Sequence, residues 1–79
     1  MVTVYRAHGL RIVVFVDDHE PAHVHVFGDG EAKINLAGCE GDPELIFAIG
    51  MTRAETRRAM GVVKEQQAYL LKRWSEIHG

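Results

Sequence analysis

Cysteine and proline are both scarce in this chain of 79 residues, which contains one cysteine, Cys39, and two prolines. A single cysteine excludes an intramolecular disulfide framework, and it excludes zinc sites that need two or four thiolates. The low proline content, with no biased tract and with 47% hydrophobic residues, excludes a disordered or collagen-like chain. The composition therefore predicts a folded protein from a reducing compartment.

Long hydrophobic segments are also absent. No apolar run exceeds the five residues of Ile12–Val16, whereas a membrane-spanning helix needs about 20 apolar residues. The N-terminal segment Met1–Tyr5 lacks the charged and then apolar pattern of a secretion signal. These absences predict a cytoplasmic protein. Because the chain is shorter than the usual domain of roughly 100–150 residues, residues 1–79 are expected to form one domain with one small core.

No large excess of either charge is present, because the formal net charge is −2. The charges are nevertheless unevenly distributed. Residues 1–50 contain three basic and eight acidic side chains, a balance of −5, and residues 51–79 contain six basic and three acidic side chains, a balance of +3. The low overall charge argues against nonspecific nucleic-acid binding, which needs many Lys and Arg contacts on one surface. A local basic surface in the C-terminal part stays compatible with this argument.

Alternating and β-branched segments predict four to five strands, arranged as two hairpins and a fifth strand or extended segment. These segments are Val2–Arg6, Leu10–Val16, His23–Phe27, Glu31–Leu36 and Glu44–Ile49. Because the second segment is apolar on both faces, we expect it at the centre of the sheet or with its second face covered by another chain.

The second hairpin has a self-consistent register if Phe27 pairs with Glu31 across the glycine-containing turn. His25 then lies opposite Lys33, and His23 lies opposite Asn35. One face of the hairpin carries only apolar side chains, namely Val24, Val26, Ala32, Ile34 and Leu36. The other face is polar apart from Phe27, so the sequence predicts a core on one side of the sheet and a candidate binding surface on the other.

A helix is predicted from Thr52 to about Ile77. The sequence Thr52-Arg53-Ala54-Glu55 matches the capping box, so Thr52 is the expected N-cap. Helical spacing predicts a buried stripe, in which the glutamine is expected to bond to backbone or a loop: Thr56, Met60, Val63, Gln67, Leu70, Trp74 and Ile77. Val62 and Tyr69 lie outside this stripe and are expected to be exposed or covered by another subunit. The predicted fold is α+β, with a small antiparallel sheet packed against one long C-terminal helix.

The most distinctive segment contains three histidines. His23 and His25 are expected side by side on one face of a strand, about 7 Å apart at Cα, and His19 can fold back over them from the preceding loop. These three are the candidate ligands for a divalent metal, with a neighbouring carboxylate from Asp17, Asp18 or Glu20 in support. Lys33 argues against a metal ion, because an ammonium group beside a divalent cation is unfavourable. We therefore expect no cofactor. A structural alternative stays open, in which the imidazoles bond to backbone and loop carboxylates and fix the turn before Pro21.

His23, His25 and Lys33 are also the candidate catalytic residues. A histidine can act as general acid or base and a lysine can stabilise negative charge, which is the minimum set for cleaving a phosphodiester. No nucleophile motif or glycine-rich phosphate loop accompanies them. We therefore favour the interpretation of the chain as a binding protein over its interpretation as an enzyme. The candidate binding residues are Asp18, His19, His23, His25, Lys33 and Asn35 on the sheet, and Arg53, Arg57 and Lys64 on one flank of the helix.

Two spaced segments, Asp18–Val26 (DHEPAHVHV) and Gly30–Ile34 (GEAKI), resemble the bacterial domain-of-unknown-function family four-one-six-zero. That family shows an Asn/Asp-His-x-Pro-Pro-His-x-His-Val segment and then a Gly-Glu-Ala-Lys segment, and Ala22 stands here where a second proline is usual. Gly50–Glu55 (GMTRAE) and Trp74–Gly79 (WSEIHG) are similar to its Gly-Met-Ser-x-x-Glu helix start and its Trp-x-x-Ile-His-Gly ending. The resemblance covers essentially the whole chain.

Members of that family are small stand-alone bacterial proteins, commonly encoded beside another small protein in an arrangement similar to toxin–antitoxin pairs. The resemblance implies a cytoplasmic protein-interaction or regulatory module, acting as a homo-oligomer or in complex with the second protein. Nucleic acid would be contacted through that partner or the basic flank of the helix, and no membrane association is implied. The alternative is a ribonuclease-like or metal-dependent phosphodiester-cleaving toxin that uses His23, His25 and Lys33.

Overall fold

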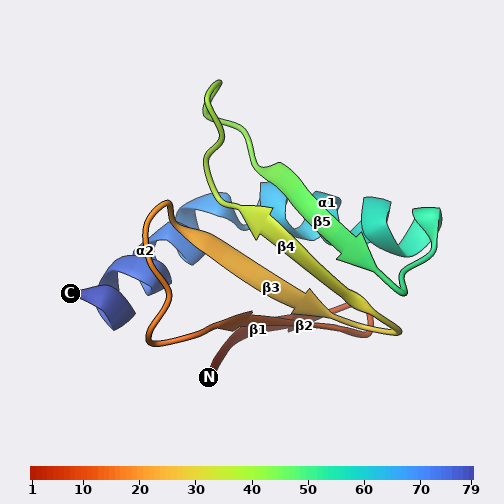
Figure 1. Ribbon diagram of the computed structural model, residues 1–79, viewed down its shortest axis with the longest axis horizontal. Coiled ribbons are helices and arrows are strands. Elements are labelled where there is room, and N and C mark those ends of the chain that lie inside the picture. The colour runs from red at the N-terminus through yellow and green to blue at the C-terminus, as the bar shows by residue number, and fades with distance from the viewer.

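Five strands are followed by two helices in the computed structural model, which describes residues 1–79 (Figure 1). The elements are β1 (Val2–Ala7), β2 (Leu10–Val14), β3 (His23–Phe27), β4 (Glu31–Asn35), β5 (Glu44–Ile49), α1 (Arg53–Glu65) and α2 (Gln67–His78). The fifth apolar segment is thus a strand. The second strand ends two residues earlier than predicted, because the chain turns at Phe15 and leaves Val16 exposed. Neither helix combines the length and apolarity needed to cross a membrane.

The strands form one antiparallel sheet in the order β1-β2-β3-β4-β5, with each strand paired to the next along the chain. The sheet is therefore a continuous meander, and a description as two hairpins covers only part of its pairing. β2 lies between β1 and β3, as expected for a strand that is apolar on both faces. Its residues Ile12, Val13 and Val14 are fully buried within the chain.

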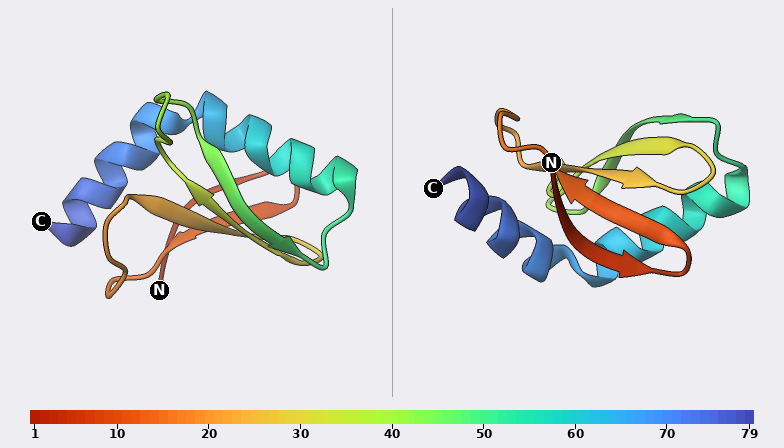
Figure 2. Two further views of the ribbon diagram at one scale, coloured as in Figure 1. Left: turned by 45° about the horizontal axis from the view of Figure 1, so that its top comes forward. Right: turned by 90° about the horizontal axis from the view of Figure 1, so that it is seen from below.

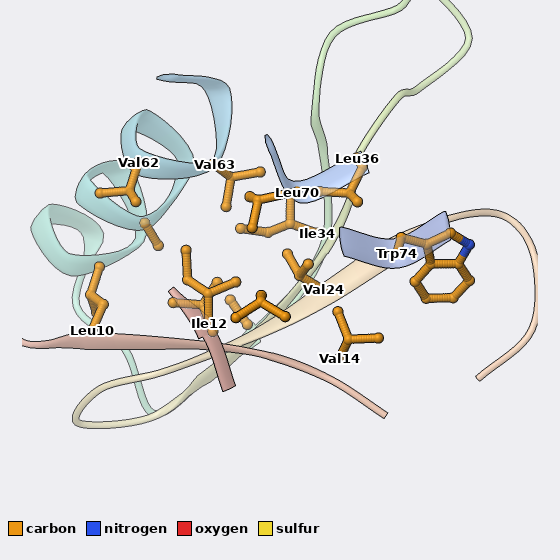
Figure 3. Close-up of a cluster of buried hydrophobic side chains, with 14 residues drawn as sticks. Leu10, Ile12, Val14, Val24, Ile34, Leu36, Val62, Val63, Leu70 and Trp74 are labelled. Carbon is orange, nitrogen blue, oxygen red and sulfur yellow. The ribbon is translucent and has the colours of Figure 1, made fainter. Parts of the chain in front are cut away.

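The register of β3 with β4 is the predicted one, from Phe27 opposite Glu31 to His23 opposite Asn35. The apolar face of this pair is completely buried. It packs against α1 and α2, which both lie on this side of the sheet (Figures 2 and 3). Each fully buried aliphatic side chain contributes about 1.5–3 kcal/mol relative to an exposed one. The core therefore fixes the position of β3 and β4, and so the direction of the side chains on their opposite face.

The prediction of one long C-terminal helix is wrong. α1 ends at Glu65 and α2 begins at Gln67, and the two helices lie at an angle to each other (Figure 2). Between them Gln66 has φ −102° and ψ 17°, outside the helical range. The Gln67 side-chain amide donates to the carbonyl oxygens of Leu36 (2.6 Å) and Gly41 (2.7 Å). The predicted bond from this glutamine to backbone is therefore confirmed. This contact ties the helix junction to the segment that follows β4.

The predicted buried stripe is confirmed at Leu70 and Trp74 in α2 and at Val63 in α1, but Thr56 and Met60 are only half-buried in α1. There the buried residues are Glu55, Ala59, Val62 and Val63. Val62 was expected outside the stripe and instead packs in the core.

The N-terminus of α1 has the predicted cap, because Thr52 Oγ1 accepts a hydrogen bond from the backbone N–H of Glu55 at 3.1 Å. The Glu55 side chain has a different role from the expected capping box. Its buried carboxylate accepts from the backbone N–H of Asp29, at 3.2 Å to each oxygen, in the turn between β3 and β4. The first turn of α1 is thereby attached to the end of the sheet.

Candidate functional site

A cavity of about 560 Å³ lies on the polar face of the sheet, beneath the loop that joins β2 to β3. The loop contributes Asp17, Asp18, His19, Glu20 and Pro21 to its wall, and the strands contribute His23, His25, Lys33, Asn35, Ile46 and Phe47. The two faces of β3 therefore have different roles, because the alternate residues Val24 and Val26 hold the strand in the core.

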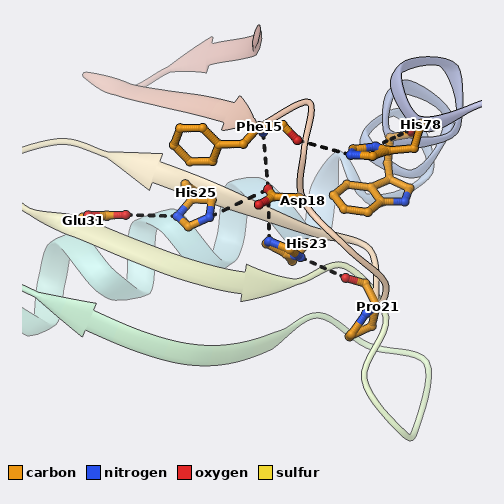
Figure 4. Close-up of polar contacts among 8 residues, drawn as sticks. Phe15, Asp18, Pro21, His23, His25, Glu31 and His78 are labelled. Carbon is orange, nitrogen blue, oxygen red and sulfur yellow. Dashed lines mark hydrogen bonds and ion pairs between the residues drawn. The ribbon is translucent and has the colours of Figure 1, made fainter. Parts of the chain in front are cut away.

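One wall of this cavity is formed by Asp18, His23 and His25, which we call the histidine–aspartate cluster (Figure 4). Asp18 Oδ2 lies 3.1 Å from His23 Nε2 and 4.0 Å from His25 Nε2. One ligand atom from each of the three residues lies within 4.8 Å of the others. Two imidazoles and one carboxylate therefore place their ligand atoms within a few ångströms of one another.

The second nitrogen of each imidazole in the cluster also has a polar partner. His23 Nδ1 lies 2.9 Å from the carbonyl oxygen of Pro21, and His25 Nδ1 lies 3.0 Å from Glu31 Oε2 (Figure 4). A carbonyl oxygen and a carboxylate oxygen only accept hydrogen bonds, so both Nδ1 atoms donate. These contacts fix the orientation of both rings and direct both Nε2 atoms toward Asp18.

The position of Asp18 is set by a tight turn at the end of β2. The backbone N–H of Asp18 donates to the carbonyl oxygen of Phe15 at 3.1 Å, and the backbone N–H of Phe15 donates to Asp18 Oδ2 at 3.3 Å. The Phe15 ring meets the His25 ring edge-on, with centroids 4.6 Å apart. The same turn therefore places the carboxylate over the cluster and packs one of its histidines.

Aromatic side chains close the cluster on the side of α2. The Trp74 ring centroid lies 5.2 Å from that of His23 and 3.7 Å from that of His78, on which it stacks. His23 is buried between this ring and the cavity. His78 contacts the carbonyl oxygens of Trp74 (3.0 Å) and Phe15 (3.2 Å), so the C-terminal turn of α2 is attached to the loop that carries Asp18.

The sheet-side candidates from the sequence gather at this one cavity. His23, His25, Lys33 and Asn35 all line it, and Lys33 is opposite His25 in the register as expected. His19 also lines the cavity, but it is exposed and Asp18 takes its expected place in the cluster.

Glu31 was missed as a partner of the histidines. The signal that could have revealed it is diagonal cross-strand pairing, because Glu31 lies two residues along β4 from Lys33, which is directly opposite His25.

The helix-side candidates lie elsewhere. Arg57 and Lys64 line a second cavity of about 350 Å³, between α1 and the segment Asp42–Pro43, and Arg53 lines neither cavity. The basic flank of the helix and the histidine–aspartate cluster are therefore separate surfaces, and the structure does not combine them into one site.

Comparison with known proteins identifies one family. Residues 9–75 match the family model described as "Domain of unknown function (DUF4160)", in agreement with the resemblance carried by the spaced motifs. No curated protein and no solved structure matches the chain.

Proposed function

The chain belongs to the DUF4160 family, whose description names no activity, and from its surface we propose that it is a protein-interaction module of the bacterial cytoplasm. The observation that carries the proposal is the free edge of β5. Its side chains Leu45, Ile46 and Ile49 are 39%, 45% and 67% exposed, although the large aliphatic side chains of β2, β3 and β4 are buried.

An exposed edge strand has unpaired backbone N–H and C=O groups, and these readily pair with a strand of another chain. Proteins usually protect such edges with lysine, proline or a bulge. The sequence of β5, ELIFAI, contains neither lysine nor proline. A register shift against β4 interrupts the strand at Ile46, and regular pairing resumes from Phe47 to Ile49. The segment Phe47–Ile49 is therefore the part of the edge best suited to pairing.

The occupant that fits this edge is a second copy of the chain. Two β5 strands related by a two-fold axis run antiparallel and present the same apolar side chains to each other. Glu44 is the only charged residue of β5 and lies at its start, so a two-fold pair places the two carboxylates at opposite ends. The pairing therefore opposes no like charges, and it shields the exposed apolar side chains of both chains.

Sedimentation equilibrium over a concentration series tests this proposal. Wild-type protein is expected to approach the mass of two chains, whereas Ile49→Lys stays at the mass of one. The matched control is Val16→Lys, which puts the same charge on a 59% exposed valine outside β5 and should associate as the wild type does. A wild type that stays monomeric throughout, or an Ile49→Lys variant that dimerises equally well, would refute the proposal.

The family resemblance adds a second occupant, a small protein encoded nearby as in toxin–antitoxin pairs. Co-expression and co-purification with that protein is the corresponding measurement. If the wild type is monomeric alone but the co-purified complex is lost in Ile49→Lys, the edge binds a different chain and the homodimer is wrong.

A second candidate function is favoured by one observation, namely that His23, His25 and Lys33 line the same cavity. We propose phosphodiester cleavage as this alternative, with a histidine as general acid or base and Lys33 stabilising negative charge. The test compares the growth of a bacterial host that expresses the wild-type protein with the growth of a host that expresses the His23→Ala, His25→Ala double variant. Both proteins are expressed at the same soluble level. Growth arrest by the wild type alone supports cleavage. Normal growth with both proteins contradicts it.

A further inference from the structure

The two histidines of the cluster are held in the tautomer that metal-binding histidines require. With Nδ1–H donating to Pro21 in one ring and to Glu31 in the other, the neutral imidazoles have their lone pairs on Nε2. Histidine ligands of metals commonly donate their second ring N–H to a carbonyl or carboxylate in this way, which fixes the ring and raises its basicity. The protein therefore already has the supporting contacts of a two-histidine metal site.

Both Nε2 lone pairs are directed toward the same carboxylate oxygen, Asp18 Oδ2. Three electron-rich atoms at this separation repel one another unless a positive charge lies between them. A proton on His23 Nε2 can bridge the 3.1 Å gap to Asp18, but it leaves His25 Nε2 without a partner at 4.0 Å. A divalent cation can contact all three atoms at once.

From this arrangement we propose that Asp18 Oδ2, His23 Nε2 and His25 Nε2 bind one divalent first-row transition-metal ion. Zinc–nitrogen and zinc–oxygen bonds of about 2.0–2.2 Å place the ligands of one ion roughly 3.0–3.5 Å apart. The Asp18–His23 distance is within this range, and the Asp18–His25 distance must shorten by roughly 0.5–1 Å. The loop that carries Asp18 supplies that movement.

The chemistry of the donors selects the class of metal. Imidazole nitrogen favours zinc, iron, nickel or copper over magnesium and calcium, which prefer oxygen ligands alone. Three protein ligands leave at least one coordination position open, and all three ligands line the cavity. An open position is typical of sites that bind a water molecule or a substrate group.

The charge around the cluster is compatible with a cation despite Lys33. The cavity wall contains the carboxylates of Asp17, Asp18 and Glu20 against the single ammonium of Lys33. Glu31 is a further carboxylate and bonds to the far side of His25. The acidic groups therefore outnumber the lysine. The position of Lys33 opposite His25 does not exclude a metal ion at the cluster.

Titration of tag-free, metal-free protein with Zn²⁺ tests the proposal by calorimetry and by tryptophan emission. Trp74 is the only tryptophan, and its ring lies beside His23, so its emission reports on the cluster. We expect one saturable Zn²⁺ per chain, with the emission changing in parallel. Asp18→Asn, which is nearly isosteric, and His25→Gln should each weaken binding at least about tenfold.

His19→Ala is the matched control, because His19 lines the same cavity but lies outside the cluster. It should bind Zn²⁺ within about twofold of the wild type, a difference small beside the loss expected when a supporting contact is removed. Far-UV circular dichroism verifies the fold of each variant.

Wild-type protein also identifies the ligands without any substitution. In long-range ¹H–¹⁵N spectra, Zn²⁺ should shift Nε2 of His23 and His25 and leave His8 and His19 unchanged. The proposal is overturned if the folded wild type shows no saturable Zn²⁺ or Co²⁺ binding, if other histidines shift instead, or if His19→Ala loses binding while a folded Asp18→Asn retains it. None of these outcomes depends on β5, so the metal site and the proposed dimer are tested separately.

Discussion

Replacing Glu55 with alanine is expected to destabilise the protein by about 2–4 kcal/mol. The buried carboxylate accepts from the N–H of Asp29 with both oxygens, and this contact links the start of α1 to the β3–β4 turn. Losing a hydrogen bond to a charged acceptor costs about 1.5–3 kcal/mol. Losing a negative charge in the first turn of a helix costs about 0.3–1 kcal/mol more.

Urea unfolding followed by far-UV circular dichroism measures this change. If the slope of the unfolding free energy against urea concentration is the same in both proteins, the substitution changes stability and not the compactness of the folded or unfolded state. In a chain of 79 residues, 1 kcal/mol corresponds to roughly 4–8 °C in Tm, so the loss is also visible by heating. Glu55→Gln should cost about 1 kcal/mol, because the amide oxygen still accepts from Asp29.

Arg58→Ala is the control for the same environment. Its guanidinium lies 3.7 Å from Glu55 Oε2 but is about half exposed, and such ion pairs contribute about 0–1 kcal/mol. Arg58→Ala should therefore have little effect. A Glu55→Ala variant within about 0.5 kcal/mol of the wild type would behave like an ordinary surface substitution, and would refute the role given to this carboxylate.

Four further outcomes are expected. Gly30→Ala should cost at least about 2 kcal/mol in urea unfolding, because a Cβ there would overlap the backbone of Ile49 in the paired strand β5. Gln67→Ala should cost about 1–3 kcal/mol by the same assay, since two backbone carbonyls lose their donor. At a protein concentration where the wild type is monomeric, Ile49→Lys should leave stability within about 0.5 kcal/mol of the wild type, because the side chain is exposed in the single chain. Glu31→Ala should lower Zn²⁺ affinity about 10- to 100-fold in calorimetry by releasing His25 Nδ1, with the fold retained.

Most of the sheet could be predicted because each strand has its own local signal. The period of two residues in β3 and β4 allows one register that buries every apolar side chain on one face, and a slip by one residue would expose Val24 and Ile34. The bulge in β5 could not be predicted in the same way. That strand has three apolar residues in succession, Leu45, Ile46 and Phe47. Without alternation of polar and apolar residues, the sequence does not indicate which face of the sheet each side chain occupies.

The helix junction could not be predicted, because neither a proline nor a glycine marks it. The interruption at Gln66 accompanies a tertiary contact, in which Gln67 bonds to carbonyl oxygens far away in the chain. Of the residues predicted to be buried in α1, Val63 is buried, whereas Thr56 and Met60 are only half-buried and Glu55, Ala59 and Val62 are buried beside them.

The difference between strand and loop also explains which part of the candidate site the sequence could predict. His23 and His25 belong to a strand whose alternate residues are fully buried, so alternation alone places both imidazoles on the polar face. Asp18 and His19 are neighbours in a loop, and only the turn at Phe15 decides which of them meets the strand. Spacing rules favoured the histidine, and the folded loop instead contributes the carboxylate.

This division between strand and loop also determines how the cluster can respond to a ligand. The core beneath Val24 and Val26 fixes the backbone of β3, and the Nδ1 contacts fix the two rings, so the imidazoles are preorganised. Asp18 is held by the turn at Phe15 and by its contact with His23, and it is the ligand that must move to close the gap to His25. A metal ion would therefore exert its structural effect on the loop and not on the sheet. Since that loop forms one wall of the cavity and contacts α2 through His78, binding at the cluster would be transmitted to the cavity mouth and to the C-terminal turn.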